Sequence, residues 1–185
     1  MNCTAIVLAA GQGKRMKSKI QKQFLLLKGK PVLFYSISCF EKSSEIDDII
    51  IVTGAESVEY VKREIVEPCG FQKVKAVVTG GKERYDSVYE GLKACQNCDY
   101  VFIHDGARPF VTEEMIERGK KAVIAGGACV LGVPSKDTVK ITDEEGFVES
   151  TPKRARVWNI QTPQIFSYPE IYSAYQKAKQ EGMQG

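Results

Sequence analysis

Short apolar runs alternate with amphipathic segments along most of this chain, and this alternation limits its possible folds more strongly than any other feature. The apolar runs are rich in β-branched residues and nearly continuous, which predicts strands buried on both faces. Strands separated by helices in this way form a mainly parallel sheet. The predicted strands lie around Ile6–Leu8 and at Asp47–Thr53, Lys73–Thr79, Asp99–His104 and Cys129–Val133, and the predicted helices are Pro31–Lys42, Glu56–Glu67, Arg84–Cys95, Thr112–Ala125 and Ser167–Gly182.

The length and composition agree with a single α/β domain over residues 1–185. A chain of 185 residues can bury a sizeable core, and 43% hydrophobic with 26% charged residues is typical of a globular protein. We expect no transmembrane helix, because no apolar run approaches 18 residues. The six cysteines are scattered among strands and helices, which predicts reduced thiols and a cytoplasmic location. Cys95 and Cys98 form one CxxC pair, but a single histidine makes a zinc site a poor alternative.

The alternation breaks between Ser135 and Gln164. Polar and apolar residues alternate in Thr138–Ile141 and Phe147–Glu149, around a turn at 143–146, which predicts an antiparallel hairpin. We expect Trp158 and a loop containing Pro163 to follow it. A lone hairpin has too little core of its own. We therefore expect an arm over about 136–157 that packs on a partner subunit, with an ordinary surface arm as the alternative.

The first predicted strand runs into a glycine turn and then into a group of cations. Gly11 and Gly13 allow the backbone to approach a ligand closely. Residues 1–40 contain seven Lys or Arg and no Asp or Glu, so they are net +7 in a chain of net +3. A local charge of this kind beside a glycine turn predicts a polyphosphate site, and an ordinary βα turn with a solvated basic segment is the alternative. The P-loop and dinucleotide-binding patterns are both absent.

Two further turns follow predicted strands, at Gly80–Gly81 and at Asp105–Gly106. The carboxyl ends of parallel strands meet at one edge of a sheet, so the three turns should converge on one ligand. Asp105 is a candidate for holding Mg²⁺ or a sugar hydroxyl, because a hard cation prefers carboxylate oxygen; a turn-forming aspartate is the alternative. His104 precedes it in a strand, so its side chain should point to the opposite face, and we interpret it as a packed structural histidine.

No Ser, Cys or His arrangement in the chain resembles a nucleophile with its base. Nucleotidyl transfer fits this absence, because an acceptor phosphate is already ionised. The protein then has mainly to align it with the α-phosphate and to stabilise charge on the phosphate oxygens.

Six motifs in this order resemble the 2-C-methyl-D-erythritol 4-phosphate cytidylyltransferase family. They are AAGQGKRM (9–16), the Lys22–Gln23 pair, GGKERYDSV (80–88), HDGARP (104–109), Asp137–Thr138 with Lys140, and the segment from Trp158 to Gln164 ending in TPQ. The resemblance covers nearly the whole chain. It implies the Rossmann-like fold of the nucleotide-diphospho-sugar transferases with an inserted hairpin arm, and a homodimer formed through that arm. It also implies transfer of CMP from CTP to methylerythritol phosphate, with Mg²⁺ and release of pyrophosphate, in isoprenoid precursor biosynthesis.

The resemblance also implies roles for individual residues. Arg15 and Lys22 match the residues that stabilise the transition state at the α-phosphate. Nucleotide contacts are implied for Ala9, Ala10, Gly11, Gly13, Gly81, Ser87, Asp105 and Gly106, and contacts to the sugar-alcohol substrate for Asp105, Arg108, Thr138, Arg154 and Thr162, some of them from the arm of the second subunit. Lys82 departs from the pattern, because some members carry an acidic residue there. The family continues past the position of Gly185 to a substrate-binding lysine, so no residue up to Gly185 takes that role.

Three other functions compete with this one. A cytidylyltransferase for another sugar-alcohol phosphate, such as ribitol 5-phosphate, would share the fold and the arm, although AAG at 9–11 and Gly106–Ala107 favour methylerythritol phosphate. An inactive nucleotide-binding protein would bind CTP without releasing pyrophosphate. A nucleic-acid surface over the basic residues is disfavoured, because Phe24 is the one aromatic near the cations.

Overall fold

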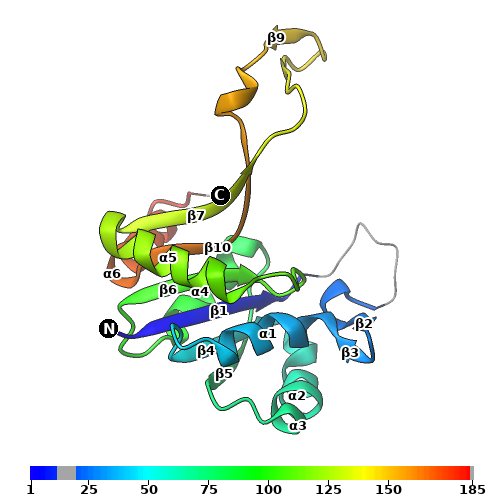
Figure 1. Cartoon of the computed structure of the whole chain (residues 1–185), viewed down its shortest axis with the longest axis vertical. Helices are drawn as coiled ribbons and strands as arrows, with labels where there is room; N and C mark the ends of the chain where they lie inside the picture. The colour runs from blue at the N-terminus through cyan, green and yellow to red at the C-terminus, as the bar shows by residue number, and fades with distance from the viewer. Residues whose placement is uncertain (12–19, 184–185) are drawn as a thin grey trace.

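The computed structural model describes residues 1–11 and 20–183, and over these residues the chain forms a six-stranded sheet with helices on both faces (Figure 1). The strand order is β5-β4-β1-β6-β10-β7. The strands are β1 (Cys3–Ala9), β4 (Asp48–Thr53), β5 (Val74–Thr79), β6 (Tyr100–Asp105), β7 (Ala128–Pro134) and β10 (Trp158–Ser167). β1 pairs in parallel with β4 and β6, and β4 with β5, whereas β10 is antiparallel to both of its neighbours. The predicted α/β fold with a mainly parallel sheet is confirmed.

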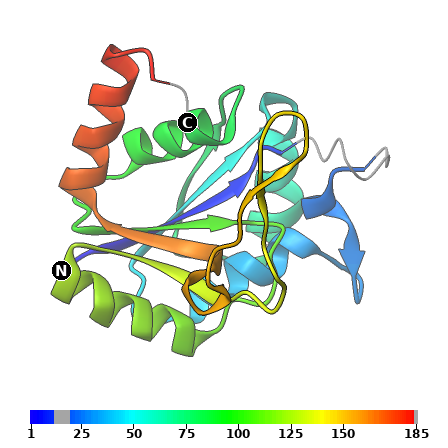
Figure 2. The same cartoon turned by 90° about the horizontal axis from the view of Figure 1, so that it is seen from above.

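The helices divide between the two faces of the sheet (Figure 2). One face carries α1 (Val32–Lys42), the continuous helical segment α2–η4–α3 (Val58–Tyr60, Val61–Val66 and Glu67–Cys69) and α5 (Glu113–Gly126). The other face carries α4 (Arg84–Ala94) and α6 (Tyr168–Gln180). α1 buries Leu33, Ile37 and Phe40, which recur at helical spacing. Each predicted helix is present, within two residues at most ends.

β1 separates the two halves of the core because its side chains alternate between the faces. Ala5 and Val7 pack with α1 and α5, whereas Ile6 packs with α4, and all three are fully buried. The same alternation in β6 sends Phe102 to the first half and Ile103 to the second. A strand that is apolar on both faces fits a central position in the sheet. The continuous apolar run of β1 agrees with its position between β4 and β6.

The expected loop around Pro163 is wrong, because this segment is the antiparallel strand β10 inside the sheet. β10 pairs with β6 and β7, and its register to β7 shifts between Ile160 and Gln164. Proline cannot donate a ladder hydrogen bond, so it is tolerated in a sheet where the ladder is irregular. Pro163 lies inside this irregular stretch, which is why an interior strand can contain it.

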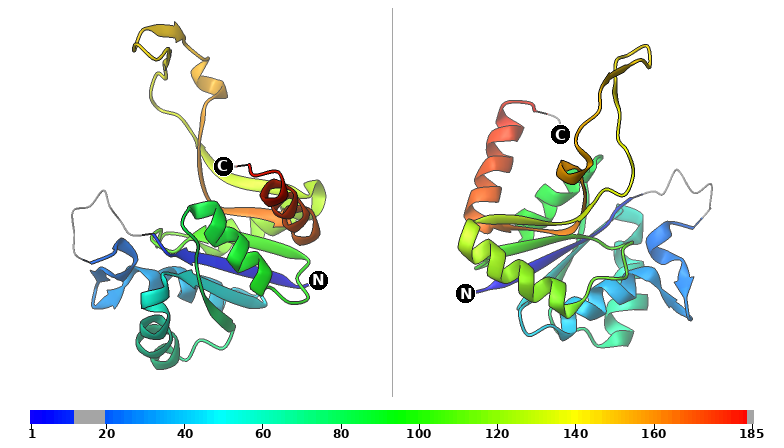
Figure 3. Two further views of the ribbon diagram at one scale, coloured as in Figure 1. Left: turned by 180° about the vertical axis from the view of Figure 1, so that it is seen from behind. Right: turned by 45° about the horizontal axis from the view of Figure 1, so that its top comes forward.

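Several smaller elements lie between the main strands and helices, and three of them form the arm. η2 (Lys22–Phe24) leads into a short hairpin of β2 (Leu26–Leu27) and β3 (Lys30–Pro31), and η3 (Ala55–Ser57) follows β4. The predicted hairpin at 136–157 is present as β8 (Ile141–Thr142), β9 (Val148–Ser150) and η5 (Arg154–Arg156). This arm projects away from the body in both views of Figure 3. None of the described helices is long and apolar enough to span a membrane.

Candidate active site

The carboxyl ends of β1, β5 and β6 meet at one edge of the sheet, as the three turns predict. The Gly106 backbone N–H donates to the Leu8 carbonyl over 2.8 Å, which joins the β6 turn to β1. The Gly80 N–H donates to the Thr53 carbonyl over 2.8 Å. A Cβ added to Gly80 would lie 2.8 Å from the Cβ of Ala10, so glycine is needed for this close approach. The three turns therefore form one continuous surface.

A buried glutamine fixes the Lys22 segment against the first turn. The Gln23 Nε2 donates to the Ala9 carbonyl over 2.6 Å and to the Gly11 carbonyl over 3.1 Å, and its side chain is almost fully buried. Lys22 is its neighbour in η2, so these contacts fix the backbone of the segment that carries Lys22 relative to the first turn. The predicted site residues Gly13 and Arg15 lie outside the described residues.

The second turn is tied to the first turn of α4. The Gly81 N–H donates to the Ser87 Oγ over 3.2 Å, and the Ser87 hydroxyl donates to the Glu83 carbonyl over 3.2 Å. Glu83 and Asp86 form a reciprocal capping box that starts α4. The N–H groups of both glycines are therefore used within the protein, while Gly81 itself is exposed at the surface.

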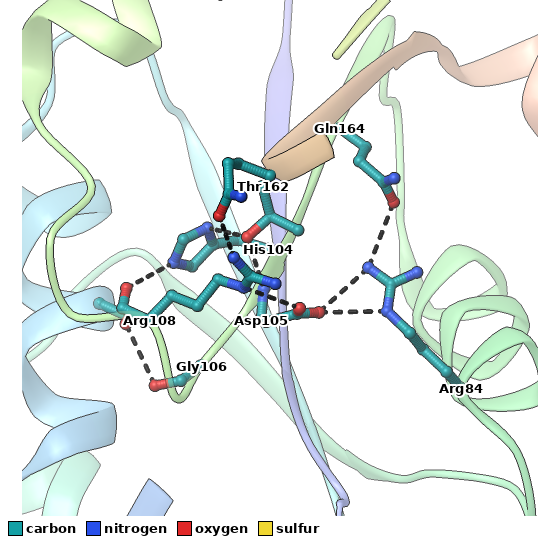
Figure 4. Close-up of polar contacts among 9 residues, drawn as sticks. Arg84, His104, Asp105, Gly106, Arg108, Thr162 and Gln164 are labelled. Atoms are coloured by element: carbon teal, nitrogen blue, oxygen red, sulfur yellow. Dashed lines mark hydrogen bonds and ion pairs between the residues drawn. The ribbon is translucent and has the colours of Figure 1, made fainter. Parts of the chain in front are cut away.

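Asp105 lies between two guanidinium groups at the end of β6 (Figure 4). Its Oδ1 accepts from Arg84 Nε over 3.1 Å and Nη2 over 3.0 Å, and its Oδ2 accepts from Arg108 Nε over 3.1 Å. Arg84 also donates to Gln164 Oε1 over 3.2 Å, and Arg108 donates to Gln161 Oε1. Two cations around one carboxylate leave a net positive charge, so the cluster favours an anionic ligand.

A neutral histidine supports this cluster from the opposite face of β6. His104 Nε2 lies 3.0 Å from the Arg108 carbonyl, which can only accept, so Nε2 carries the proton. Nδ1 is then an acceptor for the Thr162 hydroxyl at 2.9 Å, and that hydroxyl accepts from the Asp105 N–H at 3.2 Å. Burial lowers the pKa of His104 to about 4, which agrees with the neutral ring. The prediction of a structural histidine is confirmed.

Comparisons with known proteins decide the family. The family model IspD, 2-C-methyl-D-erythritol 4-phosphate cytidylyltransferase, matches residues 3–185. The chain is 54% identical over 172 residues to the protein of that name from Lachnoclostridium phytofermentans, covering 93% of this chain and 73% of the relative. It is 50% identical over 173 residues to the one from Clostridium kluyveri, covering 94% and 75%. The chain belongs to this family.

Two solved structures superpose closely on this chain. The 4-diphosphocytidyl-2C-methyl-D-erythritol synthase from Anaerococcus prevotii superposes with a TM-score of 0.87 at 34% identity, covering all of this chain and 78% of the other. The 2-C-methyl-D-erythritol 4-phosphate cytidylyltransferase from Francisella tularensis superposes with a TM-score of 0.79 at 27% identity, covering 98% and 80%. The chain therefore has the fold of the cytidylyltransferase family, which is a family of nucleotidyltransferases.

Apart from Gly13 and Arg15, which lie outside the described residues, the sequence-predicted residues of this cytidylyltransferase divide into two groups. The structure brings one group together at the carboxyl edge of the sheet: Ala9, Ala10, Gly11, Lys22, Gly81, Ser87, Asp105, Gly106, Arg108 and Thr162. Thr138 and Arg154 lie instead on the arm that rises from the body. The chain's own fold thus does not place these two beside Asp105.

Three residues of the Asp105 cluster have no role in the sequence analysis. Arg84 lies in the GGKERYDSV motif, and its position at the start of α4 was the available signal for it. Gln161 and Gln164 lie in the motif from Trp158 to Gln164, but their segment is wrongly predicted as a loop and only β10 places them beside β6. Sequence patterns predict helices and strands more readily than they predict which side chains of different elements come into contact.

The residues at this edge do not form a cage for Mg²⁺ by themselves. In the described parts of the chain, no group of three or more His, Cys, Asp or Glu side chains could hold a metal ion. Asp105 is the carboxylate at the centre of the cluster, and both of its oxygens contact guanidinium groups. A magnesium ion at this edge would take most of its ligands from the phosphates of a nucleotide.

Proposed function

We propose that this chain transfers CMP from CTP to 2-C-methyl-D-erythritol 4-phosphate, giving 4-diphosphocytidyl-2-C-methyl-D-erythritol and pyrophosphate. The observation that carries the proposal is the 54% identity, over 93% of the chain, to a protein named as that cytidylyltransferase. The geometry supports it, because three strand-end turns and a cationic cluster adjoin one another at one edge of the sheet. This is where α/β sheets bind nucleotides.

The reaction in this proposal is a displacement at the α-phosphorus of CTP. A phosphate oxygen of the acceptor forms a bond to the α-phosphorus, and the bond from that phosphorus to the bridging oxygen breaks. Pyrophosphate leaves with the electron pair. The attacking oxygen is already ionised, so no general base is needed. His104 agrees with this, because both of its ring nitrogens are occupied by Thr162 and the Arg108 carbonyl.

In this mechanism the chain binds, aligns and neutralises. Lys22 would supply a positive charge for the phosphates, and the contacts of its neighbour Gln23 with the first turn support this role. Arg15 would add a second charge, as the resemblance implies. The turns at Ala9–Gly11 and Gly81 would hold the nucleotide, with Ser87 behind the second turn. Asp105 and Arg108 would bind hydroxyl groups of ribose and of the sugar alcohol.

We also propose Mg²⁺ as the cofactor, held mainly by the phosphates of CTP with Asp105 as the nearest carboxylate. The charge of a triphosphate and the oxygen preference of Mg²⁺ support this assignment. The bound ion would neutralise phosphate charge. A cytoplasmic location is proposed as well, since all six cysteines are free thiols.

A homodimer formed through the arm is the fourth part of the proposal. Phe147 is 73% exposed on the arm, and Trp158 at its base is 54% exposed. Beside the base lies a largely apolar groove of about 980 Å³ between α5, β7 and β10. Large apolar side chains exposed beside an apolar groove are typical of a protein–protein interface. A second copy would bring Thr138 and Arg154 to the partner's site.

The test is a pyrophosphate-release assay with CTP and Mg²⁺. We compare methylerythritol phosphate, ribitol phosphate and no acceptor, using the unaltered chain and a Lys22→Ala variant. We expect release with methylerythritol phosphate alone, and a decrease of about 10²- to 10³-fold in kcat for the variant, as for other groups that stabilise transition-state charge. Release with ribitol phosphate would favour the related cytidylyltransferase. CTP binding without release would indicate an inactive nucleotide-binding protein.

A further inference from the structure

An ion pair joins the last helix to the turn that we assign to the nucleotide. Lys179, near the end of α6, donates through its Nζ to the Oδ1 of Asp86 in the first turn of α4. The two residues are 93 positions apart in the sequence. The Asp86 side chain is 19% exposed and that of Lys179 is 40% exposed, so the pair lies at the surface and the aspartate is the more covered of the two. Within the described residues, neither Lys179 nor Asp86 is hydrogen-bonded to a residue of the Asp105 cluster.

Asp86 supports the Gly80–Gly81 turn directly. Its Oδ2 accepts from the Glu83 N–H over 3.1 Å, which completes the capping box. A Cβ added to Gly81 would lie 2.2 Å from the Cβ of Asp86, so the turn rests against this side chain. The next residue, Ser87, accepts from the Gly81 N–H. Any shift of Asp86 would therefore move the turn that we propose contacts the base.

Lys179 is itself held in place by the packing of α6 on α4. Tyr89 of α4 stacks with Tyr172 and Tyr175 of α6, with ring centroids 6.0 and 6.2 Å apart. The Lys179 Nζ lies 5.2 Å from the centre of the Tyr85 ring and 6.0 Å from that of Tyr89. The hydrogen bond from Lys179 lowers the pKa of Asp86, and Asp86 raises the pKa of Lys179. Both groups are thus charged at neutral pH.

We propose that Lys179 is a positioning residue for nucleotide binding, which holds Asp86 and through it the Gly80–Gly81 turn in the conformation that receives CTP. This inference rests on the proposed function. It extends that function by giving α6, which supplies none of the predicted site residues, a defined part in the affinity for the nucleotide. The predicted consequence is specific: CTP binding should depend on Lys179, whereas the chemical step should not.

The experiment measures CTP binding by calorimetry without acceptor, together with KM and kcat, for Lys179→Met and Asp86→Asn. Met keeps the apolar stem over the tyrosines, and Asn keeps an oxygen for the Glu83 N–H, so each variant removes mainly the ion pair. We expect CTP affinity to fall about three- to tenfold, because Asp86 loses the partner that holds it against the turn. kcat should stay within about twofold. Lys179→Arg keeps the cation and should retain the CTP affinity of the unaltered chain. The double variant should lose little more CTP affinity than either single variant.

Lys177→Met is the matched control, because this lysine lies on the same helix, is 73% exposed and pairs with Glu181 at 3.8 Å. It should leave CTP affinity unchanged. Unchanged CTP affinity in Lys179→Met, with only a lower melting temperature, would overturn the positioning role and leave a structural one. If the unaltered chain does not bind CTP, the proposed function fails first and the positioning role falls with it. Binding and turnover by the unaltered chain, with both variants binding CTP as tightly as the unaltered chain does, would refute the positioning role alone.

Discussion

His104 is the residue for which the structure makes the sharpest prediction about pH. It is the one histidine of the chain, it is buried to 1% exposure, and burial lowers its pKa to about 4 from a usual 6.5. Between these two values the unfolded chain binds a proton that the folded chain does not. Stability should therefore fall as the pH falls from about 6.5 towards 4, by roughly 2–3 kcal/mol at pH 4.5 from this group.

Urea unfolding at pH 7 and pH 4.5 measures this effect. The comparison is with His104→Gln, which cannot titrate, so that the carboxylates common to both proteins cancel. The free energy of unfolding of the unaltered chain should decrease more steeply than that of the variant. Because the chain has a single imidazole, NMR can also follow its titration without assignment by mutation. A folded-state pKa near 6.5 would contradict the buried, neutral ring.

At the scale of single residues, sequence reasoning succeeded where the backbone decides the answer. The alternation of side chains in a strand predicted that His104 and Asp105 face opposite sides of the sheet. The structure confirms it: the ring centroids of His104 and Phe40 of α1 are 5.3 Å apart, whereas Asp105 binds Arg84 of α4 on the other face. It could not predict that Arg84 binds Asp105, since those residues come from two different elements. Only the packing of α4 against the sheet brings them together.

Gly91 fixes how closely helix α4 approaches the sheet. A Cβ added there would lie 2.6 Å from the Ile6 Cγ2 and 3.1 Å from the Val52 Cγ2, and both side chains are buried and β-branched. Gly91→Ala should therefore lower the free energy of unfolding by about 1–2 kcal/mol, because overpacking outweighs the gain in helix propensity. Gly126→Ala in α5 is the control, as nothing lies within 4 Å of its added Cβ.

Denaturant unfolding of the two variants checks this prediction. Gly126→Ala should leave stability unchanged or raise it by up to about 1 kcal/mol, through helix propensity alone. Equal effects of the two alanines would show that α4 shifts away from β1 at no cost. The turn at Gly80–Gly81 would then move with α4, and CTP affinity would change even though stability did not.

At the scale of elements, the apolar runs predicted five strands, and β10 was missed. Its sequence, WNIQTPQIFS, contains a proline and five polar residues, so neither strict alternation nor a continuous apolar run is present. β10 is stabilised by pairing on both sides with β6 and β7, which are distant in the sequence. Local propensity cannot report such pairing, because it depends on tertiary contacts.

For the molecule as a whole, topology made the position of the site predictable. Parallel strands place their carboxyl ends at one edge, so three turns spread from Gly11 to Gly106 were expected to meet, and they do. The direction of the arm was not predictable. A two-stranded hairpin has no core that would fix its orientation, so its position depends on what it packs against. Thr138 and Arg154 therefore became site candidates only through the family resemblance.

The arm yields a prediction that separates two assemblies. If Arg154 serves the partner's site, mixing an inactive Lys22→Ala chain with an inactive Arg154→Ala chain should restore activity. Each hybrid dimer would contain one site with an intact Lys22 and an intact Arg154. Random exchange makes half of the dimers hybrid, so we expect about a quarter of the unaltered activity. If Arg154 instead served its own body, every hybrid site would retain one defect and mixing would restore nothing.

Two controls make the outcome of this mixing experiment decisive. Sedimentation velocity should show a dimer for the unaltered chain and a monomer for Phe147→Asp, because a carboxylate would be buried in the interface. Ile124→Asp, at a side chain 46% exposed on α5 outside the groove, should remain dimeric. When Phe147→Asp is added to both inactive chains, mixing should no longer restore activity. Restoration that survives in the monomers would refute a site shared between subunits, because no exchange of arms could then account for it.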